Sequence, residues 1–175
     1  SHPVASRLPL DPGLTFVVLV PDRDLATKTA RGVLPETVAH HDAAFNLGRM
    51  GLLVAGLAER HRLVGEATED RLHQQARTAL FPEAPALLSG LLEAGAIATC
   101  WSGAGPSLLA ICDSSDGDTV RAGAAAANPA RSRSASAWSL IRSHAASSDE
   151  RTCACARIAP MRARAMSSSC QTSFA

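Results

Sequence analysis

The hydrophobic residues of the first 127 positions follow two different spacings, which predict a mixture of strands and helices. A continuous apolar run at residues 14–21 contains several β-branched residues and ends at a proline, as is typical of a strand covered on both faces. Shorter apolar runs at residues 96–101 and 107–112 predict two more strands. Helical spacing predicts helices at residues 25–33, 42–61, 69–80, 84–94 and 117–127.

The order of these elements is strand, helices, strand, loop, strand and helix. This order predicts an α+β sandwich in which helices cover one face of a small antiparallel sheet. Asp22 or Asp24 is expected to cap the first helix, and Gly95 is expected to end the fourth. We expect one closing strand after the last helix, but the residues that follow offer no candidate for it, so the sheet is predicted to be incomplete.

Composition divides the 175 residues into two parts. Residues 1–127 carry ten Lys and Arg against 14 Asp and Glu, whereas residues 128–175 carry seven Arg against one Asp and one Glu. Ala, Ser and Arg fill 29 of the last 48 positions, and no apolar spacing runs through them. We interpret residues 1–127 as one domain and residues 128–175 as an irregular tail that is disordered or translated out of frame.

The most informative segment is the loop at residues 102–107, Ser-Gly-Ala-Gly-Pro-Ser, which separates the two short strands. Gly103 and Gly105 permit positive φ, and Pro106 fixes the exit from the turn. Taken alone, this glycine loop is interpreted as a tight hairpin between buried strands. Its backbone N–H groups also suit an anion, so an anion-binding loop is the alternative.

Four other polar residues have two interpretations each. Thr27 and Arg31 share one helix face near the end of the first strand, either as an ordinary surface pair or as part of a ligand site. Asn46 interrupts the apolar spacing of its helix and is either bonded within the core or facing a site. His73 is expected to have a structural hydrogen-bonding role, with general base as the alternative.

Several classes of function are not expected. Two of the five cysteines flank the glycine loop and three lie in the tail, which favours a reducing, cytoplasmic setting over a disulfide framework. The histidines and cysteines lack the spacing of a zinc site, so no metal ligands are assigned. No apolar run approaches the ~20 residues that cross a bilayer, and the basic tail lacks interleaved aromatic residues. Neither a membrane nor a nucleic acid is expected as a partner.

About residues 7–127 resemble the C-terminal half of the homoserine kinases, which belong to the superfamily of galacto-, homoserine, mevalonate and phosphomevalonate (GHMP) kinases. The resemblance rests on an ordered set of segments. They are Val-Val-Leu-Val-Pro at 17–21, Thr-Lys-Thr-Ala-Arg at 27–31 with Leu-Pro at 34–35, Ala-Phe-Asn at 44–46, Glu-Asp-Arg-Leu-His-Gln at 69–74 with Arg77, and the glycine loop at 102–107. Gln75 and Ala76 depart from the proline and aromatic residue that relatives usually have.

The resemblance implies ATP-dependent transfer of the γ-phosphoryl group to the side-chain hydroxyl of L-homoserine, giving O-phospho-L-homoserine in threonine biosynthesis. Thr27, Arg31, Arg77 and Gly103 would line the substrate site, where a guanidinium can grip a carboxylate through two hydrogen bonds. The glycine loop would close over the substrate and the transferring phosphate. Its members are Ser102, Gly103, Ala104, Gly105, Pro106 and Ser107.

The nucleotide loop and the acidic Mg²⁺ ligand of this family lie in its N-terminal half, and no segment here matches either. ATP, Mg²⁺ and an N-terminal lobe are therefore implied partners whose binding residues are mostly missing, and no catalytic residue is identifiable in this chain. Because Ser1 is not an initiator Met, we expect the chain to be part of a longer protein. A homodimer is a further option, and the chain alone is expected to be inactive.

Three functions remain open on the sequence. They are a partial homoserine kinase that needs its other lobe, a stand-alone amino-acid-binding module, and a non-functional truncated product. Another GHMP small-molecule kinase is a second alternative to the homoserine kinase. The out-of-frame interpretation predicts that an adjacent reading frame from about Asn128 restores a family-like ending.

Overall fold

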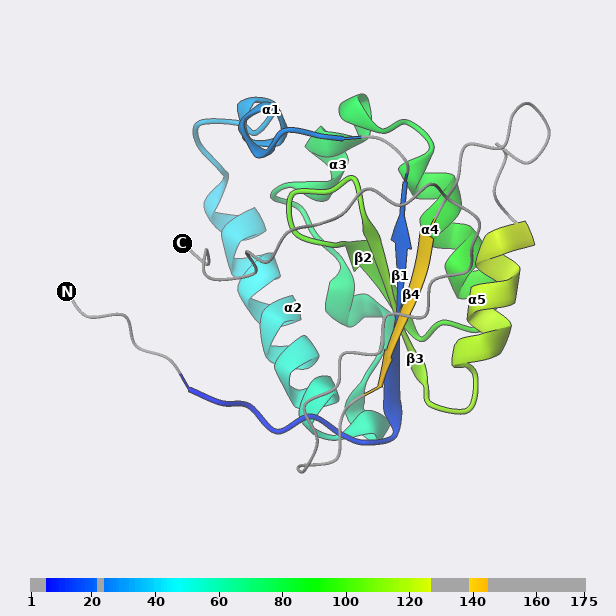
Figure 1. The fold of residues 1–175 in the computed structure, drawn as a ribbon. Coiled ribbons are helices and arrows are strands. Elements are labelled where there is room, and N and C mark those ends of the chain that lie inside the picture. The colour runs from blue at the N-terminus through cyan, green and yellow to red at the C-terminus, as the bar shows by residue number, and fades with distance from the viewer. Residues whose placement is uncertain (1–5, 22–23, 127–138, 145–175) are drawn as a thin grey trace.

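The computed structural model describes residues 6–21, 24–126 and 139–144. These residues form an antiparallel sheet with the strand order β2-β3-β1-β4. The strands are β1 (Leu14–Val20), β2 (Ala98–Trp101), β3 (Leu108–Asp113) and β4 (Ser139–His144). The helices are α1 (Thr27–Gly32), α2 (His40–Ala58), α3 (Gln74–Arg77), α4 (Ala84–Glu93) and α5 (Gly117–Ala126), with short 3-10 turns η1 (Arg60–Arg62), η2 (Gly65–Thr68) and η3 (Thr78–Leu80). Figure 1 shows α4 and α5 to one side of the sheet and α2 to the other.

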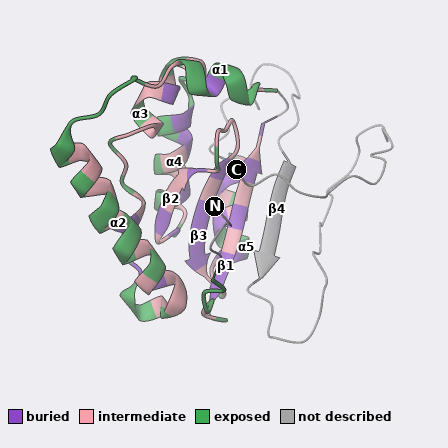
Figure 2. Cartoon of the chain, turned by 90° about the vertical axis from the view of Figure 1, so that its left-hand side faces the viewer, coloured by how far each residue is buried: buried purple, intermediate pink, exposed green. Residues whose placement is uncertain are grey.

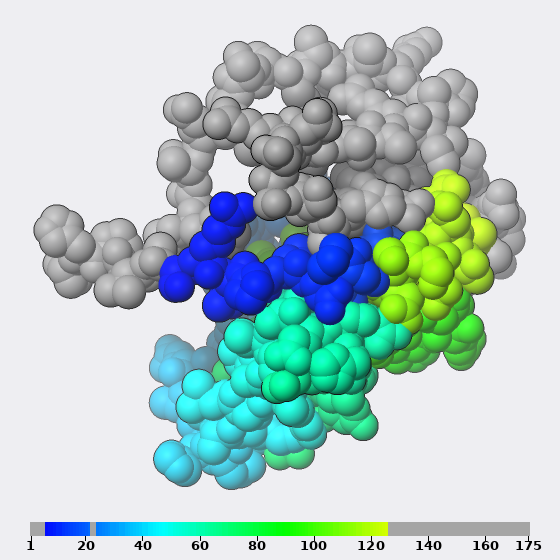
Figure 3. All heavy atoms as spheres, turned by 90° about the horizontal axis from the view of Figure 1, so that it is seen from below, coloured from blue at the N-terminus to red at the C-terminus, as the bar shows by residue number. Residues whose placement is uncertain are grey.

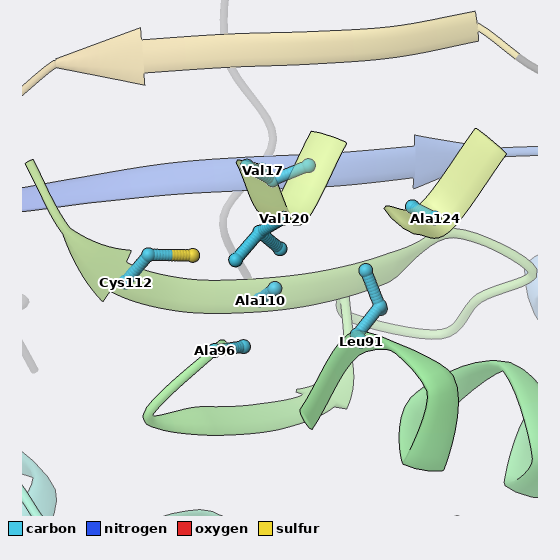
Figure 4. Close-up of a cluster of buried hydrophobic side chains, with 7 residues drawn as sticks. All are labelled: Val17, Leu91, Ala96, Ala110, Cys112, Val120 and Ala124. Atoms are coloured by element: carbon cyan, nitrogen blue, oxygen red, sulfur yellow. The ribbon is translucent and has the colours of Figure 1, made fainter. Parts of the chain in front are cut away.

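A core of small and branched side chains closes the face of the sheet toward α4 and α5 (Figure 4). Val17 of β1 and Ala110 of β3 meet Val120 of α5 there, and none of the three is exposed. Leu91 of α4 completes the contact and is 1% exposed. These elements agree with the predicted α+β class, since alternate residues of β1 and β3 point toward the two helices. The predicted coverage of one face only is not met, because α2 packs on the opposite face.

The opposite face packs against α2 and the turns that follow it. Leu14 and Ile111 contact Leu63 and Ala67, and the C-terminal half of α2 packs behind this cluster. Figure 2 shows β1, β2 and β3 largely buried while α2 keeps a long exposed side. Gly56 permits the close approach, because a Cβ at this position would lie 2.7 Å from the Cα of Leu63. Among the described residues, none of the helices combines the length and hydrophobicity that would let it span a bilayer.

Carboxylates fasten the end of the sheet where β1 begins. The Asp11 side chain accepts the backbone N–H of Arg60 at 2.6 Å, and the Asp11 N–H donates to the carbonyl of Leu57 at 2.8 Å. The guanidinium of Arg60 in turn binds Asp113 at the end of β3. The backbone N–H groups of Arg60 and Gly13 hold the pKa of Asp11 below its ordinary value. In Figure 3 the residues before β1, in blue, lie against the turquoise end of α2.

The predicted helix at 69–80 is wrong in its first half. Helix α3 covers only Gln74–Arg77 and continues as η3, while residues 69–73 are not helical. The reason is Asp70, whose carboxylate accepts the backbone N–H groups of three following residues: Leu72, His73 and Gln74. Such side-chain acceptance replaces the helical carbonyl partner and starts a new helix instead of continuing one.

The other predicted elements are found within a few residues of their expected positions. One detail differs at α1, whose N-cap is Ala26 with no side-chain hydrogen bond, so Asp24 does not cap it; Asp22 lies outside the described residues. Gly95 follows α4 with a φ of 106°, as expected for a helix-ending glycine.

The expectation that the tail offers no closing strand is also wrong. Residues Ser139–His144 form β4, which pairs antiparallel with β1 along Thr15–Val20. An open edge of β1 presents a row of unpaired N–H and C=O groups, and any extended segment of sufficient length can satisfy them. The rest of the predicted tail, including its three cysteines, lies outside the described residues.

Candidate functional site

The glycine loop lies at the end of the sheet where β1 finishes, together with α1 and α3 (Figure 1). It closes as a hairpin, because the Ser102 N–H donates to the Ser107 carbonyl at 2.9 Å and the Gly105 N–H donates to the Ser102 carbonyl at 3.1 Å. Gly103 and Gly105 have φ values of 59° and 83°, a region that favours glycine. The first interpretation of the loop, a tight hairpin between buried strands, is therefore confirmed.

The geometry is also compatible with the anion-binding interpretation. The N–H groups of Gly103 and Ala104 have no acceptor within the described part of the chain. Gly103 is exposed and Ala104 is partly exposed, so both amides are open to a ligand. Consecutive free N–H groups in a tight turn form a site of positive potential for a phosphate or carboxylate oxygen.

Arg77 connects the glycine loop to α1. Its Nη1 donates to the Gly103 carbonyl at 2.8 Å, and its Nε donates to the Ala30 carbonyl at 3.4 Å. Only 8% of Arg77 is exposed. The predicted substrate-binding arginine is thus largely occupied by the protein's own carbonyls, and among its nitrogens Nη2 makes no hydrogen bond to the described residues. Any ligand carboxylate at this arginine would bind through Nη2.

Asp70 organises the segment before Arg77. Its Oδ2 accepts N–H groups of His73 and Gln74 at 2.7 Å each, and its Oδ1 accepts the side-chain amide of Asn46 at 2.7 Å. Burial raises the pKa of Asp70, but the hydrogen bonds from Gln74, His73 and Asn46 outweigh burial and hold the pKa below its ordinary value. Asp70 is therefore an ionised group whose carboxylate is used to hold this segment in place.

The structure decides between the two interpretations of Asn46. Its side-chain carbonyl accepts the Arg71 N–H at 3.0 Å while its amide donates to Asp70, so both ends of the carboxamide are bonded within the protein. No local pattern pairs Asn46 with Asp70, which is 24 positions away. The only sign of this pairing in the sequence is that Asn46, a polar residue, interrupts an apolar helix face and so needs a hydrogen-bonding partner.

His73 has the hydrogen-bonding geometry of a structural residue. Its Nδ1 accepts from Nη1 of Arg77 at 3.1 Å, and its Nε2 lies 3.5 Å from the Asp70 carboxylate. Burial lowers the pKa of His73, Asp70 opposes this, and Arg77 adds to the lowering. Because Nδ1 already accepts a hydrogen bond from a guanidinium, it is not available to take a proton from a substrate hydroxyl.

Thr27 and Arg31 lie on α1 with exposed side chains, at the first and fifth positions of that helix. The structure brings α1 to the site, since the carbonyl of neighbouring Ala30 accepts the hydrogen bond from Arg77. It shows no hydrogen bond or ion pair from Thr27 or Arg31 to the glycine loop. Both side chains are therefore exposed to solvent on α1.

An open cavity of about 640 Å³ lies on the outer side of edge strand β2 and was not predicted. Gln74 forms part of its wall and links two segments, donating to the Thr68 carbonyl at 2.9 Å and accepting the Trp101 N–H at 3.1 Å. Glu66, Glu69 and Asp70 also line the cavity. Three carboxylates disfavour a phosphate or carboxylate ligand here, so this cavity is distinct in chemistry from the glycine loop.

The two cysteines of the described residues are unsuited to nucleophilic chemistry. Burial raises the pKa of Cys100 and that of Cys112 to about 11, so both stay as thiols near neutral pH. Both are free cysteines. Within the residues that the structure describes, no group of three or more His, Cys, Asp or Glu side chains is arranged to hold a metal ion.

Comparisons with known proteins agree on one family. Residues 44–130 match the family model described as GHMP kinases C terminal. The chain is 45% identical over 118 residues to the homoserine kinase of Streptomyces coelicolor, which covers 67% of this chain and 38% of that protein. It is 49% identical over 104 residues to the homoserine kinase of Streptomyces avermitilis, covering 59% of this chain and 34% of that protein.

A solved structure gives the same result. The crystal structure of homoserine kinase from Cytophaga hutchinsonii superimposes with a TM-score of 0.65 and 28% identity, over 79% of this chain and 44% of that one. The chain therefore spans less than half the length of each of these relatives.

Proposed function

Residues 44–130 of this chain belong to the C-terminal domain family of the GHMP kinases, and from this premise we propose that the chain provides the L-homoserine side of a homoserine kinase site. The proposed reaction is ATP-dependent phosphorylation of the L-homoserine side-chain hydroxyl. The observation that carries the proposal is the bond from Arg77 to the Gly103 carbonyl, which holds a loop with two open N–H groups beside α1.

In this proposal the charged groups bind the two ends of the acceptor. The exposed guanidinium of Arg31 and Nη2 of Arg77 would bind the amino-acid carboxylate, and the Thr27 hydroxyl would orient its polar groups. The N–H groups of Gly103 and Ala104 would stabilise the transferring phosphoryl group, since phosphoryl transfer depends mainly on positioning and charge stabilisation. No protein nucleophile is required, which agrees with the raised pKa of Cys100.

The described residues fit a phosphate better than they fit a metal-bound nucleotide. The open loop amides suit phosphate oxygens, whereas Asp70 already accepts four hydrogen bonds from the protein, three at Oδ2 and one at Oδ1. Bound ATP and Mg²⁺ supply the phosphoryl group and neutralise its charge. We propose that their ligands come from a further lobe, and that this chain alone has little or no kinase activity.

Calorimetric titration of the full chain with L-homoserine tests the proposal. We expect saturable binding that Arg31→Ala weakens at least about tenfold, because an exposed guanidinium that binds the carboxylate is lost. Arg121→Ala is the matched control, since Arg121 lies on α5 and should leave the affinity unchanged. Absence of binding by the folded chain would contradict the proposal and favour a non-functional product.

A coupled ADP-release assay separates the remaining alternatives. Activity that appears only when a separately expressed N-terminal lobe is added supports the kinase, and homoserine binding without any such activity supports an amino-acid-binding module. Homoserine-dependent turnover by the chain alone would overturn the expected inactivity. A preference for mevalonate or galactose over homoserine would identify another GHMP kinase instead.

A further inference from the structure

A continuous series of polar contacts runs from α2 to the glycine loop. Asn46 donates to Asp70 at 2.7 Å, and Asp70 lies 3.5 Å from Nε2 of His73. Nη1 of Arg77 lies 3.1 Å from Nδ1 of His73 and donates to the Gly103 carbonyl at 2.8 Å. The same guanidinium nitrogen therefore contacts both the imidazole and the loop.

The chemistry of these groups fixes the proton on His73. A guanidinium is always charged and only donates, so Nδ1 must be an unprotonated acceptor for its contact with Arg77 to be a hydrogen bond. The imidazole proton then resides on Nε2, on the side of the Asp70 carboxylate. A second proton on Nδ1 would remove the acceptor and place a positive charge 3.1 Å from the Arg77 nitrogen.

We propose that His73 is a positioning residue that holds Arg77 on the Gly103 carbonyl only while its imidazole is neutral, so that a proton on Nδ1 releases the glycine loop. His73 acts on the loop through Arg77 and touches no reacting atom. We expect the released loop to bind substrate less well, an expectation that rests on the proposed function, whereas the link between His73 and loop order does not.

The groups around His73 make it the one that titrates near neutral pH. Asp70 and Arg77 are the charged groups that face it, and Cys100 is coupled electrostatically to Asp70. Asp70 stays ionised because its pKa lies below the ordinary value, and Cys100 stays neutral because its pKa is about 11. Of these groups only His73 changes its charge near neutral pH, and its lowered pKa places the change below pH 6.5.

Hydrogen exchange at the Gly105 amide measures loop order without any ligand. This N–H donates to the Ser102 carbonyl across the loop, so its protection factor reports the closed hairpin. In the full chain we expect the protection factor to fall about tenfold between about pH 7.5 and pH 5, after correction for the intrinsic exchange rate. A protection factor that is constant over this range, or absent at pH 7.5, overturns the proposal.

Two variants distinguish this role from a merely structural one. In His73→Asn the carboxamide lies near the former Nδ1 and can accept from Arg77 without titrating, so high protection at both pH values is expected. In His73→Gln the carboxamide reaches toward the former Nε2 instead, so low protection at both pH values is expected. A His73→Asn variant that shows the same pH dependence as the parent chain would contradict the proposal.

Homoserine affinity over the same pH range is the second readout. If the protection factor responds as expected and homoserine does not bind at any pH, the proposed function fails while the role of His73 stands. If homoserine binds with pH-independent affinity and Gly105 protection is constant, the role of His73 fails while the proposed function stands.

Discussion

Gly105 lies against the indole ring of Trp101, so closely that a Cβ on residue 105 would be 2.5 Å from Cε3 and Cζ3 of the ring. Trp101 ends β2, is 4% exposed and packs edge-on against Phe81 at a centroid distance of 5.9 Å. The ring therefore has no room to retreat, and the shape of the glycine loop depends on a buried aromatic pair.

This contact predicts that Gly105→Ala destabilises the domain more than Gly103→Ala does. Both glycines have positive φ, so each substitution should cost about 1 kcal/mol of unfolding free energy from backbone strain. A Cβ at residue 103 meets nothing within 4 Å, whereas one at 105 adds overpacking against Trp101 of about 1–3 kcal/mol. Urea denaturation of both variants measures the difference, and equal losses would show that the indole moves aside.

The glycines of α2 offer an independent test of packing. Gly48→Ala and Gly51→Ala place a Cβ in open space and improve helix propensity, so each should raise the unfolding free energy by up to about 1 kcal/mol. Gly56→Ala would place its Cβ 2.7 Å from the Cα of Leu63, and should lower the unfolding free energy by about 1–3 kcal/mol despite the same gain in propensity. Denaturant melts check the opposite signs, and a stabilising Gly56→Ala would contradict the packing of α2 on the turn at residue 63.

Asp70 predicts an acid-dependent loss of stability. Its folded pKa lies below the ordinary 3.8, so its carboxylate contributes fully to stability above that value and the contribution is lost as the pH falls through the folded pKa. Asp70→Asn should lower the unfolding free energy by about 1–2 kcal/mol at neutral pH, because a charged cap for three N–H groups is lost. Denaturation at a series of pH values should also show a smaller acid decline in the variant, and parallel curves would contradict this role.

His73 adds a separate step at higher pH. Its folded pKa lies below the ordinary 6.5, so the unfolded chain binds this proton first and stability begins to fall as the pH drops below about 6.5. The loss should level off once the pH is below the folded pKa. Asp70→Asn retains this step, which separates the two groups in the same series of measurements.

The edge of β1 predicts what happens when the tail is removed. A chain that ends at residue 127 lacks β4 and leaves the β1 edge from Thr15 to Val20 unpaired. Because unpaired edges template association between chains, we expect more aggregation than for the full chain at equal concentration. Size-exclusion chromatography with light scattering measures this, and a monomeric truncated chain would show that β4 is dispensable.

The division of the chain at residue 127 stays a proposal, and so does the out-of-frame origin of the tail. Translating the two adjacent frames of the coding sequence from about Asn128 should give a family-like ending. If neither frame does so, the out-of-frame interpretation fails. The pairing of β4 with β1 is compatible with either outcome, since strand pairing uses backbone groups that every sequence carries.

Local sequence patterns predicted most of the elements but not the contacts between them. The β-branched run of β1 and the apolar spacing of α4 depend on nearby residues, which is why both were found at the expected positions. The helix predicted at 69–80 failed because one side chain, Asp70, competed with the helical carbonyls. Asp70 could have been identified as a residue that caps a helix, but the apolar spacing around it predicted one continuous helix instead.

The site was predictable in its residue types and not in its bonding. Family resemblance singled out Arg77 and the glycine loop, but the bond between them joins positions 26 residues apart and depends on how α3 packs on the sheet. Arg77 was expected to bind a substrate, and the structure shows three of its contacts made to Ala30, His73 and Gly103. Sequence alone carries no information on how many donors of an arginine are already in use.

The contacts that Asp11, Arg60 and Asp113 form lie at the opposite end of the sheet from the glycine loop, because Asp113 pairs with the first residue of β1. They fasten the first residues of the fold, the end of α2 and the end of β3 without any contribution from Arg77 or His73. Opening of the loop would therefore break the bond from Arg77 to Gly103 and leave the contacts of Arg60 with Asp11 and Asp113 intact. Release of the glycine loop is therefore expected to loosen the connection between β2 and β3 while Asp113 keeps the far end of β3 attached to Arg60.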